Sequence, residues 1–243
     1  MKLFLFVILL FFSGISLTLA ESNALVQRQD WKYEITPYLW AVGFDGTVGN
    51  GGTTSPINNN YQFFVMENLD NGGAFAFEAS REKWGLLFDA LYVKFTDTFN
   101  NALFTTKVIT RDGFFEGVLR YSLDDKYNID LLAGFRYVDV NLDLRLDPGP
   151  DTRGNKDWID PMVGLRATFH PLDKWIIRVR GDIGGFGLAS DLATNAAITI
   201  GYSVTQNTTI KFGYRYLKVD FNDDLFVHNV SLSGVGVGLG YSF

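Results

Sequence analysis

The chain has 243 residues, of which 47% are hydrophobic, 16% aromatic and 20% charged, and its net charge at pH 7 is −6. A net negative charge argues against nucleic acid as a partner, because nucleic-acid binding demands a basic footprint. The sequence contains no Cys, which excludes disulfide bonds. Many aromatic residues, 25 Gly and only 6 Pro favour a β-protein over a helical one.

The first twenty residues have the pattern of a secretory signal. Lys2 precedes an unbroken apolar run over residues 3–12, and the small residues Thr18 and Ala20 occupy positions −3 and −1 of a cleavage site. Ten apolar residues are too few to span a bilayer as a helix. We therefore expect residues 1–20 to be a cleaved signal peptide and residues 21–243 to form one exported domain.

Beyond residue 30 the chain consists of segments in which apolar residues alternate with polar or small ones. A period of two predicts strands with two unlike faces. The ten segments cover residues 31–43, 73–80, 84–95, 113–123, 127–146, 158–169, 175–186, 192–202, 209–219 and 228–243. The last segment is the clearest, because its apolar residues alternate with Gly or Ser from Val235 to Phe243. Such a strand indicates one face against lipid and one face in a crowded interior.

The connections between these segments alternate in length. Short turns lie near Glu82, Asp125, Leu172 and Gln206. Longer polar connections cover residues 44–72, 96–112, 145–157, 186–191 and 220–228. Short turns at one end and long loops at the other are typical of outer-membrane barrels. The sequence therefore predicts an all-β fold, a closed antiparallel up-and-down transmembrane barrel of ten strands, with eight or twelve as alternatives. Residues 59–70 could form a short helix or an extra strand.

Two segments change their apolar face part-way along. In residues 127–146 the apolar positions are odd up to Tyr137 and even from Val138 to Leu144. The last segment shows the same change at Ser233 and Gly234. Because a β-bulge shifts the side-chain phase by one residue, we expect a bulge at each place.

The inward faces carry charges of both signs in nearly equal number. A narrow barrel has an interior that side chains fill, and buried charges must pair. One interpretation is a salt-bridged plug that closes the lumen, and the other is a narrow polar path with Arg178, Arg180 and Asp182 as its constriction. The interior residues that we single out are Arg120, Arg136, Arg166, Arg178, Arg180, Lys211, Arg215, Glu116, Asp130, Asp160 and Asp182, with Lys32, Glu34, Glu78 and Asp89 as further members.

Several short runs resemble a family of small proteobacterial outer-membrane barrels that is similar to the OmpA- and OmpW-like proteins. These runs are residues 37–40, 84–85, 160–166, 180–187 and 213–216. The last strand, with Tyr241 and Phe243, also resembles the final strand that marks such barrels for insertion by the barrel-assembly machinery. The resemblance implies the fold and the location, and it transfers no catalytic or binding residue.

Enzymatic activity is not expected from the pattern of His residues. His170 falls at a short turn, and His228 opens the last segment, with Ser231 three positions further on. Residues three apart on a regular strand face opposite sides, which does not suit a His–Ser pair. The spacings used by the omptin proteases and the lipid A deacylases are absent. Acidic loops near Asp147 and Asp220 match no known cation loop, so we expect no metal and no cofactor.

The sequence thus predicts an integral protein of the bacterial outer membrane. Its expected role is structural or surface-interacting with a largely closed lumen; the alternatives are a narrow porin-like channel for small solutes and, less favoured, an outer-membrane enzyme. The expected partners are outer-membrane lipids, lipopolysaccharide and the barrel-assembly machinery, and we expect the protein to be a monomer.

Overall fold

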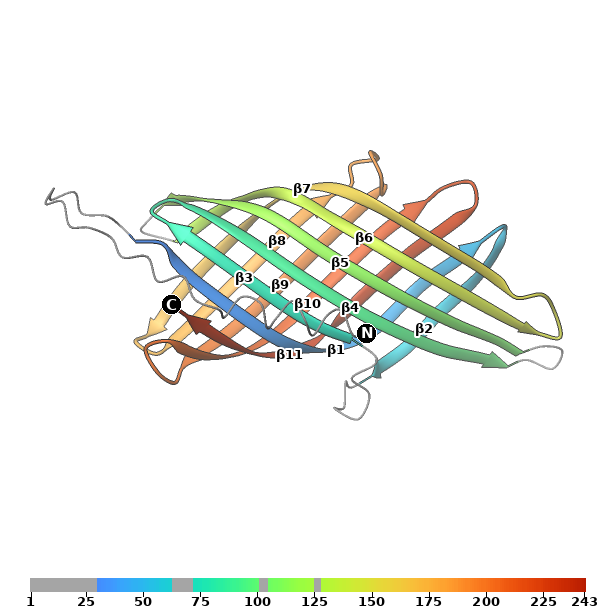
Figure 1. Ribbon diagram of the computed structural model, residues 1–243, viewed down its shortest axis with the longest axis horizontal. Helices are drawn as coiled ribbons and strands as arrows, with labels where there is room; N and C mark the ends of the chain where they lie inside the picture. Colours follow the sequence, from blue (N-terminus) through green and yellow to red (C-terminus); the bar gives the residue numbers. More distant parts are fainter. Residues whose placement is uncertain (1–29, 63–71, 101–104, 125–127) are drawn as a thin grey trace, which may run out of the picture.

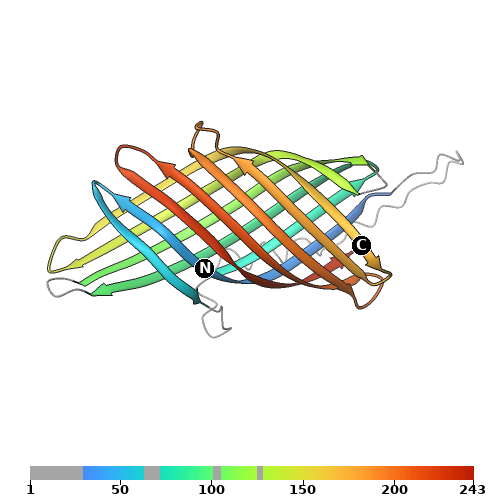
Figure 2. The same ribbon diagram turned by 180° about the vertical axis from the view of Figure 1, so that it is seen from behind.

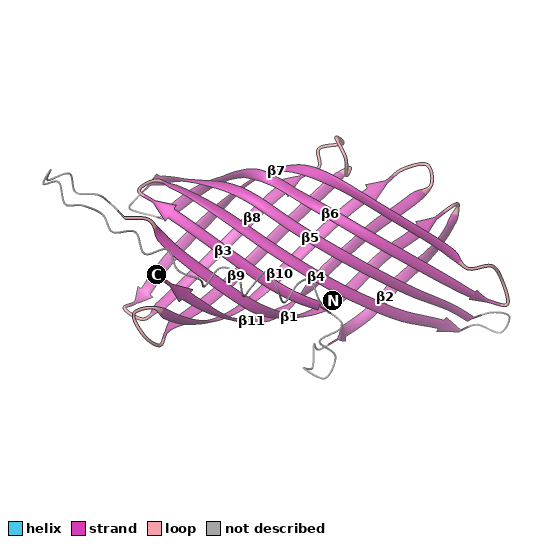
Figure 3. Ribbon diagram, viewed as in Figure 1, coloured by secondary structure: helices cyan, strands magenta, loops and turns pink. Residues whose placement is uncertain are grey.

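A computed structural model describes residues 30–62, 72–100, 105–124 and 128–243, and the regular structure within these ranges is β-strand (Figure 3). The expected signal peptide and its cleavage site lie outside the described residues. No helix in the described ranges is long and apolar enough to cross a membrane. The strands are β1 Lys32–Asn50, β2 Thr53–Gln62, β3 Gly72–Arg81, β4 Trp84–Asn100, β5 Thr105–Asp124, β6 Ile129–Asp147, β7 Thr152–Leu172, β8 Trp175–Gly184, β9 Leu192–Ser203, β10 Thr208–Asn222 and β11 Phe226–Ser242.

Ten of the eleven strands form a closed antiparallel barrel. Each of β3 to β11 pairs with its sequence neighbour, β1 pairs with β3, and β11 returns to β1 and closes the ring (Figures 1 and 2). The closing ladder is long and runs from Glu34↔Ser242 to Asn50↔Phe226. The predicted ten-stranded meander is therefore confirmed.

The eleventh strand, β2, is an addition to this ring. It forms a hairpin with the upper part of β1, from Val42 to Asn50, whereas the lower part of β1, from Lys32 to Tyr38, pairs with β3. The first long connection is thus largely strand. Of the expected helix or extra strand at residues 59–70, the part up to Gln62 is strand, and residues 63–70 lie outside the described residues.

The outer surface carries an apolar belt around the half of the barrel with the short turns. Large apolar side chains on outward positions are exposed there; on β4 these are Trp84, Leu86, Phe88 and Tyr92. Trp84 and Tyr92 lie eight positions apart, which is about 27 Å along a strand and about 20 Å along the axis of a barrel with strands tilted by about 40°. This height is close to the apolar band of about 25 Å that outer-membrane barrels carry, and this half is the membrane-spanning half.

Aromatic residues mark both edges of the belt. At the short-turn edge, rings pack in pairs. Trp84 packs at a tilt on Tyr121 at 4.7 Å and Trp175 on Tyr202 at 5.0 Å, and Tyr33 stacks on Phe243 at 5.5 Å between centroids. At the other edge lie Tyr92, Phe115 and Tyr137. Girdles of this kind are found at the two membrane–water boundaries of transmembrane barrels.

The bulges predicted near Tyr137 and at Ser233–Gly234 are wrong. The ladders of β6 with β5 and β7 run without a shift through Tyr137 and Val138, and those of β11 run without a shift through Ser233 and Gly234. Burial also keeps its alternation through both places, from Leu131 to Leu142 on β6 and from Phe226 to Val235 on β11. The backbone therefore keeps its phase, and the chemistry of the two faces changes instead.

This change occurs where the strands leave the membrane-spanning half. On β6, Arg136 is the last inward charge, and the next inward residues are Val138, Val140, Leu142 and Leu144, all buried. The outward residues become polar over the same stretch, beginning with Asp139. Inside the bilayer the apolar face meets lipid, whereas beyond it the apolar face points inward, as in a water-soluble sheet.

The part of the barrel beyond the upper girdle, which we call the outer half, has a hydrophobic core of its own. Two arcs of the one closed sheet, β2-β1-β11-β10 and β4-β5-β6-β7, face each other there and act as the two sheets of a sandwich. The buried members of this core are Trp40, Val42, Phe44, Val48, Ile57, Leu91, Val93, Phe95, Val108, Phe114, Val138, Val140, Leu142, Leu144, Trp158, Ala193, Leu217, Val219, Phe221, Phe226, Val230 and Leu232. The outer half is thus built as a β-sandwich on top of the barrel.

Aromatic stacking joins the two sheets of this sandwich. Phe44 stacks on Phe95 at 4.8 Å, and Trp158 stacks on Phe221 at 4.2 Å, above the point where the shorter β8 and β9 end. Much of the residue ranges expected to be long loops, 44–72, 96–112 and 145–157, is therefore strand. Their outward faces are polar because they face water, which is why the sequence pattern indicated loops.

Candidate functional site: the filled lumen

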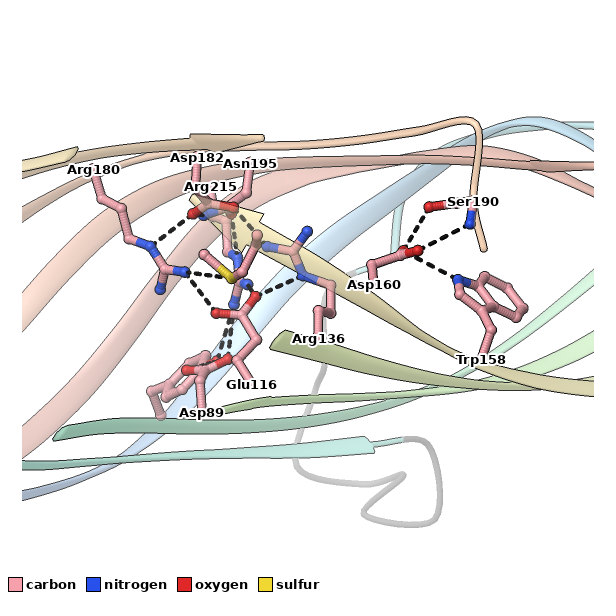
Figure 4. Close-up of polar contacts among 12 residues, drawn as sticks. Asp89, Glu116, Arg136, Trp158, Asp160, Arg180, Asp182, Ser190, Asn195 and Arg215 are labelled. Carbon is pink, nitrogen blue, oxygen red and sulfur yellow. Dashed lines mark hydrogen bonds and ion pairs between the residues drawn. The ribbon is translucent and has the colours of Figure 1, made fainter. Parts of the chain in front are cut away.

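Charged side chains cross the lumen of the membrane-spanning half in two layers. The upper layer is centred on Glu116 of β5, whose carboxylate accepts hydrogen bonds at 2.8 Å from Arg136, Arg180 and Arg215 (Figure 4). The carboxylate of Asp182 accepts hydrogen bonds from Arg136 and Arg180, also at 2.8 Å each. Asp89 of β4 pairs with Arg215 at 2.9 Å. Three arginines thus face three carboxylates, and the layer is neutral.

The lower layer lies nearer the short turns. Arg166 of β7 bridges Glu78 at 2.8 Å and Asp130 at 2.9 Å, and Arg120 contacts the same two acids at 3.7 and 2.9 Å. Lys211 pairs with Glu34 at 2.5 Å. Arg178 is held more loosely, at 3.4 Å from Glu34, and its side chain is 29% exposed. Four cations face three acids here, which leaves one positive charge in excess.

A small apolar cluster separates the two layers on one wall. Val118, Leu132 and Met162 are buried there, with Leu87 packed against them. Within the described residues, no ion pair joins the upper layer to the lower one. Pairing within each layer offsets the desolvation of its own charges, which would otherwise be prohibitive in a lumen of this size.

The structure places all eleven of the singled-out interior residues in the lumen, but it does not bring all of them together. Arg178 belongs to the lower layer, whereas Arg180 and Asp182 belong to the upper one. Asp160 joins neither layer: it accepts hydrogen bonds from Ser190 N at 2.9 Å, Ser190 Oγ at 2.6 Å and Trp158 Nε1 at 3.1 Å. Asp160 thus ties the β8–β9 connection to the wall (Figure 4).

The sequence analysis missed several neutral members of the upper layer. The hydroxyl of Tyr38 donates to Asp89 at 2.9 Å. Asn195 donates to Asp182 at 2.7 Å and accepts from Arg215 at 2.8 Å. The guanidinium of Arg215 also lies 5.8 Å from the ring centre of Trp40. The inward phase of these strands would have identified the residues, but a search restricted to charged residues passed over them.

A cavity of about 240 Å³ lies beside these layers, against the wall formed by β9, β10, β11, β1 and β3. Small inward residues make this space, among them Gly213, Gly236, Gly238 and Ala76. At Gly238 a Cβ atom would come within 2.9 Å of the Cβ of Tyr38, so the last strand can lie close to its neighbour only without a side chain. The cavity ends at Trp40, where the apolar core of the outer half begins.

A buried Asp–His pair lies in the outer half, above the membrane. Asp112 Oδ2 of β5 is 3.6 Å from His228 Nε2 of β11, and both side chains are fully buried. Thr110 Oγ1 donates a hydrogen bond to the other carboxylate oxygen. Burial raises the pKa of Asp112 to about 7 despite the Thr110 hydrogen bond, and burial lowers the pKa of His228 to about 3. Both groups are therefore uncharged between these values.

The pair predicts two opposite pH dependences of stability. Asp112 binds its proton more tightly folded than unfolded, so its contribution is full below about pH 4 and is lost as the pH rises through 7. His228 is harder to protonate when folded, so its contribution is full above about pH 6.5 and is lost as the pH falls toward 3. Relative to wild type, Asp112→Asn should gain stability as the pH rises from 4 to 7, and His228→Asn should gain it as the pH falls from 6.5 to 3.

Denaturant titrations of the refolded protein at half-unit pH steps measure both slopes. Asp143→Asn is the control, because Asp143 is on the outward face and is covered by its partners Arg145 and Arg153, which lower its pKa, and it titrates only in acid. Identical pH profiles for Asp112→Asn and the wild type would contradict the assignment of a raised pKa to Asp112.

The surroundings of the two His residues bear on catalysis. His228 is enclosed by the core and lies 6.0 Å from Trp158 between ring centres, so solvent and substrate do not reach it. His170 is exposed near the turn between β7 and β8. In the part of the chain that the structure describes, no group of three or more His, Asp or Glu side chains could hold a metal ion.

Comparison with known proteins gives similarity in structure only. No family model matches the chain, and no curated protein matches it. The outer-membrane protease OmpT from Escherichia coli is 12% identical, with 91% of this chain and 99% of that chain covered and a TM-score of 0.50. The attachment invasion locus protein Ail of Yersinia pestis is 11% identical, with coverage of 88% and 98% and a TM-score of 0.42.

The chain has the fold of the bacterial outer-membrane β-barrels. The apolar belt and its two girdles place the barrel in the outer membrane, and the short turns identify the periplasmic end. The two charge layers therefore lie within the bilayer, and the sandwich projects from the cell surface. At 12% identity, the likeness to OmpT extends to the fold and not to proteolysis.

Proposed function

We propose that this protein is a closed outer-membrane barrel whose role is carried by its projecting outer half, as a structural or surface-interacting module. The observation that carries the proposal is the apolar core that fills the lumen of the outer half, directly above the paired charges of the upper layer. Arg136 and Glu116 are buried in the upper charge layer, and immediately above them Val138, Val140 and Leu232 form a dry core. A hydrated ion has no continuous polar path through such a core.

The projecting half supports the second part of the proposal. It has its own apolar core, stacked aromatic pairs across its sheets and a polar outer face, which are the features of a stable soluble domain. Strand hairpins are also tied across its top: Asn50 Nδ2 donates to the Arg153 carbonyl at 3.0 Å, and Lys156 pairs with Asp223 at 2.6 Å. The module would present a rigid surface outside the cell.

Planar-bilayer recording on refolded protein tests the closed lumen. We expect no unit conductance for the wild type, nor for Arg178→Gln, because the apolar core lies above the layer that contains Arg178. Steady unit conductance that changes in Arg178→Gln or Arg180→Gln would contradict the proposal and favour the narrow channel, with the 240 Å³ cavity as its periplasmic vestibule. Insertion is checked in parallel by the heat-modifiable mobility of the folded barrel.

Three further expectations accompany this proposal. We propose that the protein is not an enzyme, since His228 is enclosed and His170 is at the periplasmic end. We propose a monomer, because the barrel closes on itself through β1 and β11. Tyr241 and Phe243, which lie in the periplasmic girdle, remain the predicted signal for the barrel-assembly machinery.

A further inference from the structure

Three cations on the outer surface of β4 and β5 have no acidic partner among the described side chains. Lys94 lies directly opposite Arg111 in the ladder of β4 with β5. Lys107 lies four residues from Arg111 on β5, toward the outer end of the strand and opposite Arg145 of β6. All three occupy outward positions, which alternate with the buried Val93, Val108 and Asp112. This group, which we call the β4–β5 basic patch, is thus directed away from the barrel.

On the neighbouring strands β6 and β7, the outward cations are paired with acids. Arg145 and Arg153 both pair with Asp143, at 2.9 and 3.5 Å, and Lys156 pairs with Asp223 at 2.6 Å. These cations are already neutralised by the protein. The basic patch is therefore a group of adjacent unpaired cations on one wall of the barrel, whereas Lys218 of β10 lies singly opposite Ser231 on another wall.

The height of the basic patch above the bilayer core follows from the girdle. Lys94 is two positions beyond Tyr92, and Arg111 is four positions beyond Phe115. These separations are about 7 and 13 Å along the strands, or about 5 and 10 Å along a barrel axis with strands tilted by about 40°. Lys94 and Arg111 therefore lie at the level where the headgroups of the outer leaflet begin.

A guanidinium beside an ammonium is the combination that recognises phosphate, because Arg binds two phosphate oxygens in a fork and Lys supplies a point charge. Apolar residues lie directly below it on the same two strands, Phe88 and Tyr92 on β4 and Phe115 on β5, and acyl chains would pack against them. A ligand with phosphate above and acyl chains below fits this wall.

We propose that Lys94 and Arg111 bind a phosphate group of the phosphorylated glycolipid of the outer leaflet, with Lys107 contacting anionic groups further from the bilayer. The lipid lies alongside β4 and β5, its acyl chains on the belt and its phosphate between the two cations. This site does not depend on whether the lumen conducts, so it stands or falls separately from the proposed function.

Native mass spectrometry of the refolded full chain in detergent measures the affinity for bisphosphorylated lipid A. The test variant is K94Q/R111Q, and the matched control is R145Q/R153Q, which removes the same charge from cations that Asp143 already pairs. We expect the test variant to bind about thirtyfold more weakly, since each headgroup-level cation contributes about a factor of five. The control should change the affinity less than threefold, and K107Q should fall between the two.

Chemical variation of the ligand decides the source of the phosphate. Lipid A stripped of its phosphates should bind the wild type as weakly as intact lipid A binds K94Q/R111Q. Phosphatidylglycerol should bind weakly and be little affected by the substitutions. Equal loss in both double variants, no loss on dephosphorylation, or tighter binding of a sulphated polysaccharide than of lipid A would each overturn the proposal. All five substituted side chains are on the outward face, and unchanged heat-modifiable mobility confirms that the variants fold.

Discussion

Replacing Leu232 by Lys should destabilise the protein by about 3–5 kcal/mol, because it places an unpaired charge in a dry core. Leu232 is fully buried between the two sheets of the outer half, with Val230 and Val140 in the same core. If the outer half were a water-filled lumen, an inward Lys would be tolerated. Urea unfolding of the refolded barrel, followed by Trp fluorescence, gives the free energy of unfolding for each variant.

The neighbouring residue on β11 provides the control. Ser231 is outward and lies opposite Asp45 of β1, so Ser231→Lys should change the free energy of unfolding by less than about 0.5 kcal/mol. Further down the same strand, Val237→Lys faces lipid and should cost about 2–4 kcal/mol in a bilayer. If Leu232→Lys and Ser231→Lys proved equally stable, the inversion of the two faces would be refuted.

Removing the charge of Glu116 should have an effect of similar size within the membrane. Glu116→Gln keeps the shape of the side chain but removes the negative charge that Arg136, Arg180 and Arg215 share, and it replaces one acceptor oxygen by an NH2 donor. Glu116 is 1% exposed, so water cannot replace the lost interaction. Breaking a buried ion-pair network by removing one partner costs about 3–5 kcal/mol, and the free energy of unfolding in lipid vesicles measures this loss.

An outward acid with two exposed cationic partners is the matched control for Glu116. Asp143 pairs with Arg145 and Arg153, whose side chains are 47% and 71% exposed. Because exposed ion pairs contribute about 0–1 kcal/mol, Asp143→Asn should leave stability nearly unchanged. Equal effects of the two substitutions would show that the upper layer is hydrated and not a closed plug.

The membrane-spanning half was predictable from the sequence because two simple rules apply there without conflict. Alternation assigned Ile129, Leu131 and Phe135 to the lipid face, and all are outward. It also assigned Arg136 and Glu116 to the interior, where they pair. The closing of the ring, through the pairing of β1 with β11, followed from the alternation of short and long connections.

The outer half was not predictable in the same way. Its strands have the same period of two as the membrane-spanning half, but their outward face meets water and not lipid. Apolar residues alternate from Val138 to Leu144 as regularly as from Ile129 to Tyr137. The sequence analysis assumed that every apolar face meets lipid, and this assumption required a bulge between the two stretches. The partners across the lumen were equally inaccessible. The alternation of side chains along each strand predicts that Asn195 and Arg215 point inward. The stagger between strands in the closed barrel, which the sequence does not reveal, brings them together beside Asp182.

The unbroken backbone phase through Tyr137 and Val138 means that side chains alone fix how deeply this protein sits in the bilayer. On β6 no register shift marks the membrane boundary, which is instead the point where the apolar residues change from the outward to the inward face. Moving that change by one dipeptide on every strand would raise or sink the molecule by about 5 Å without altering a single backbone hydrogen bond. Substitutions at these positions would therefore change how deeply the barrel sits in the membrane without changing its fold.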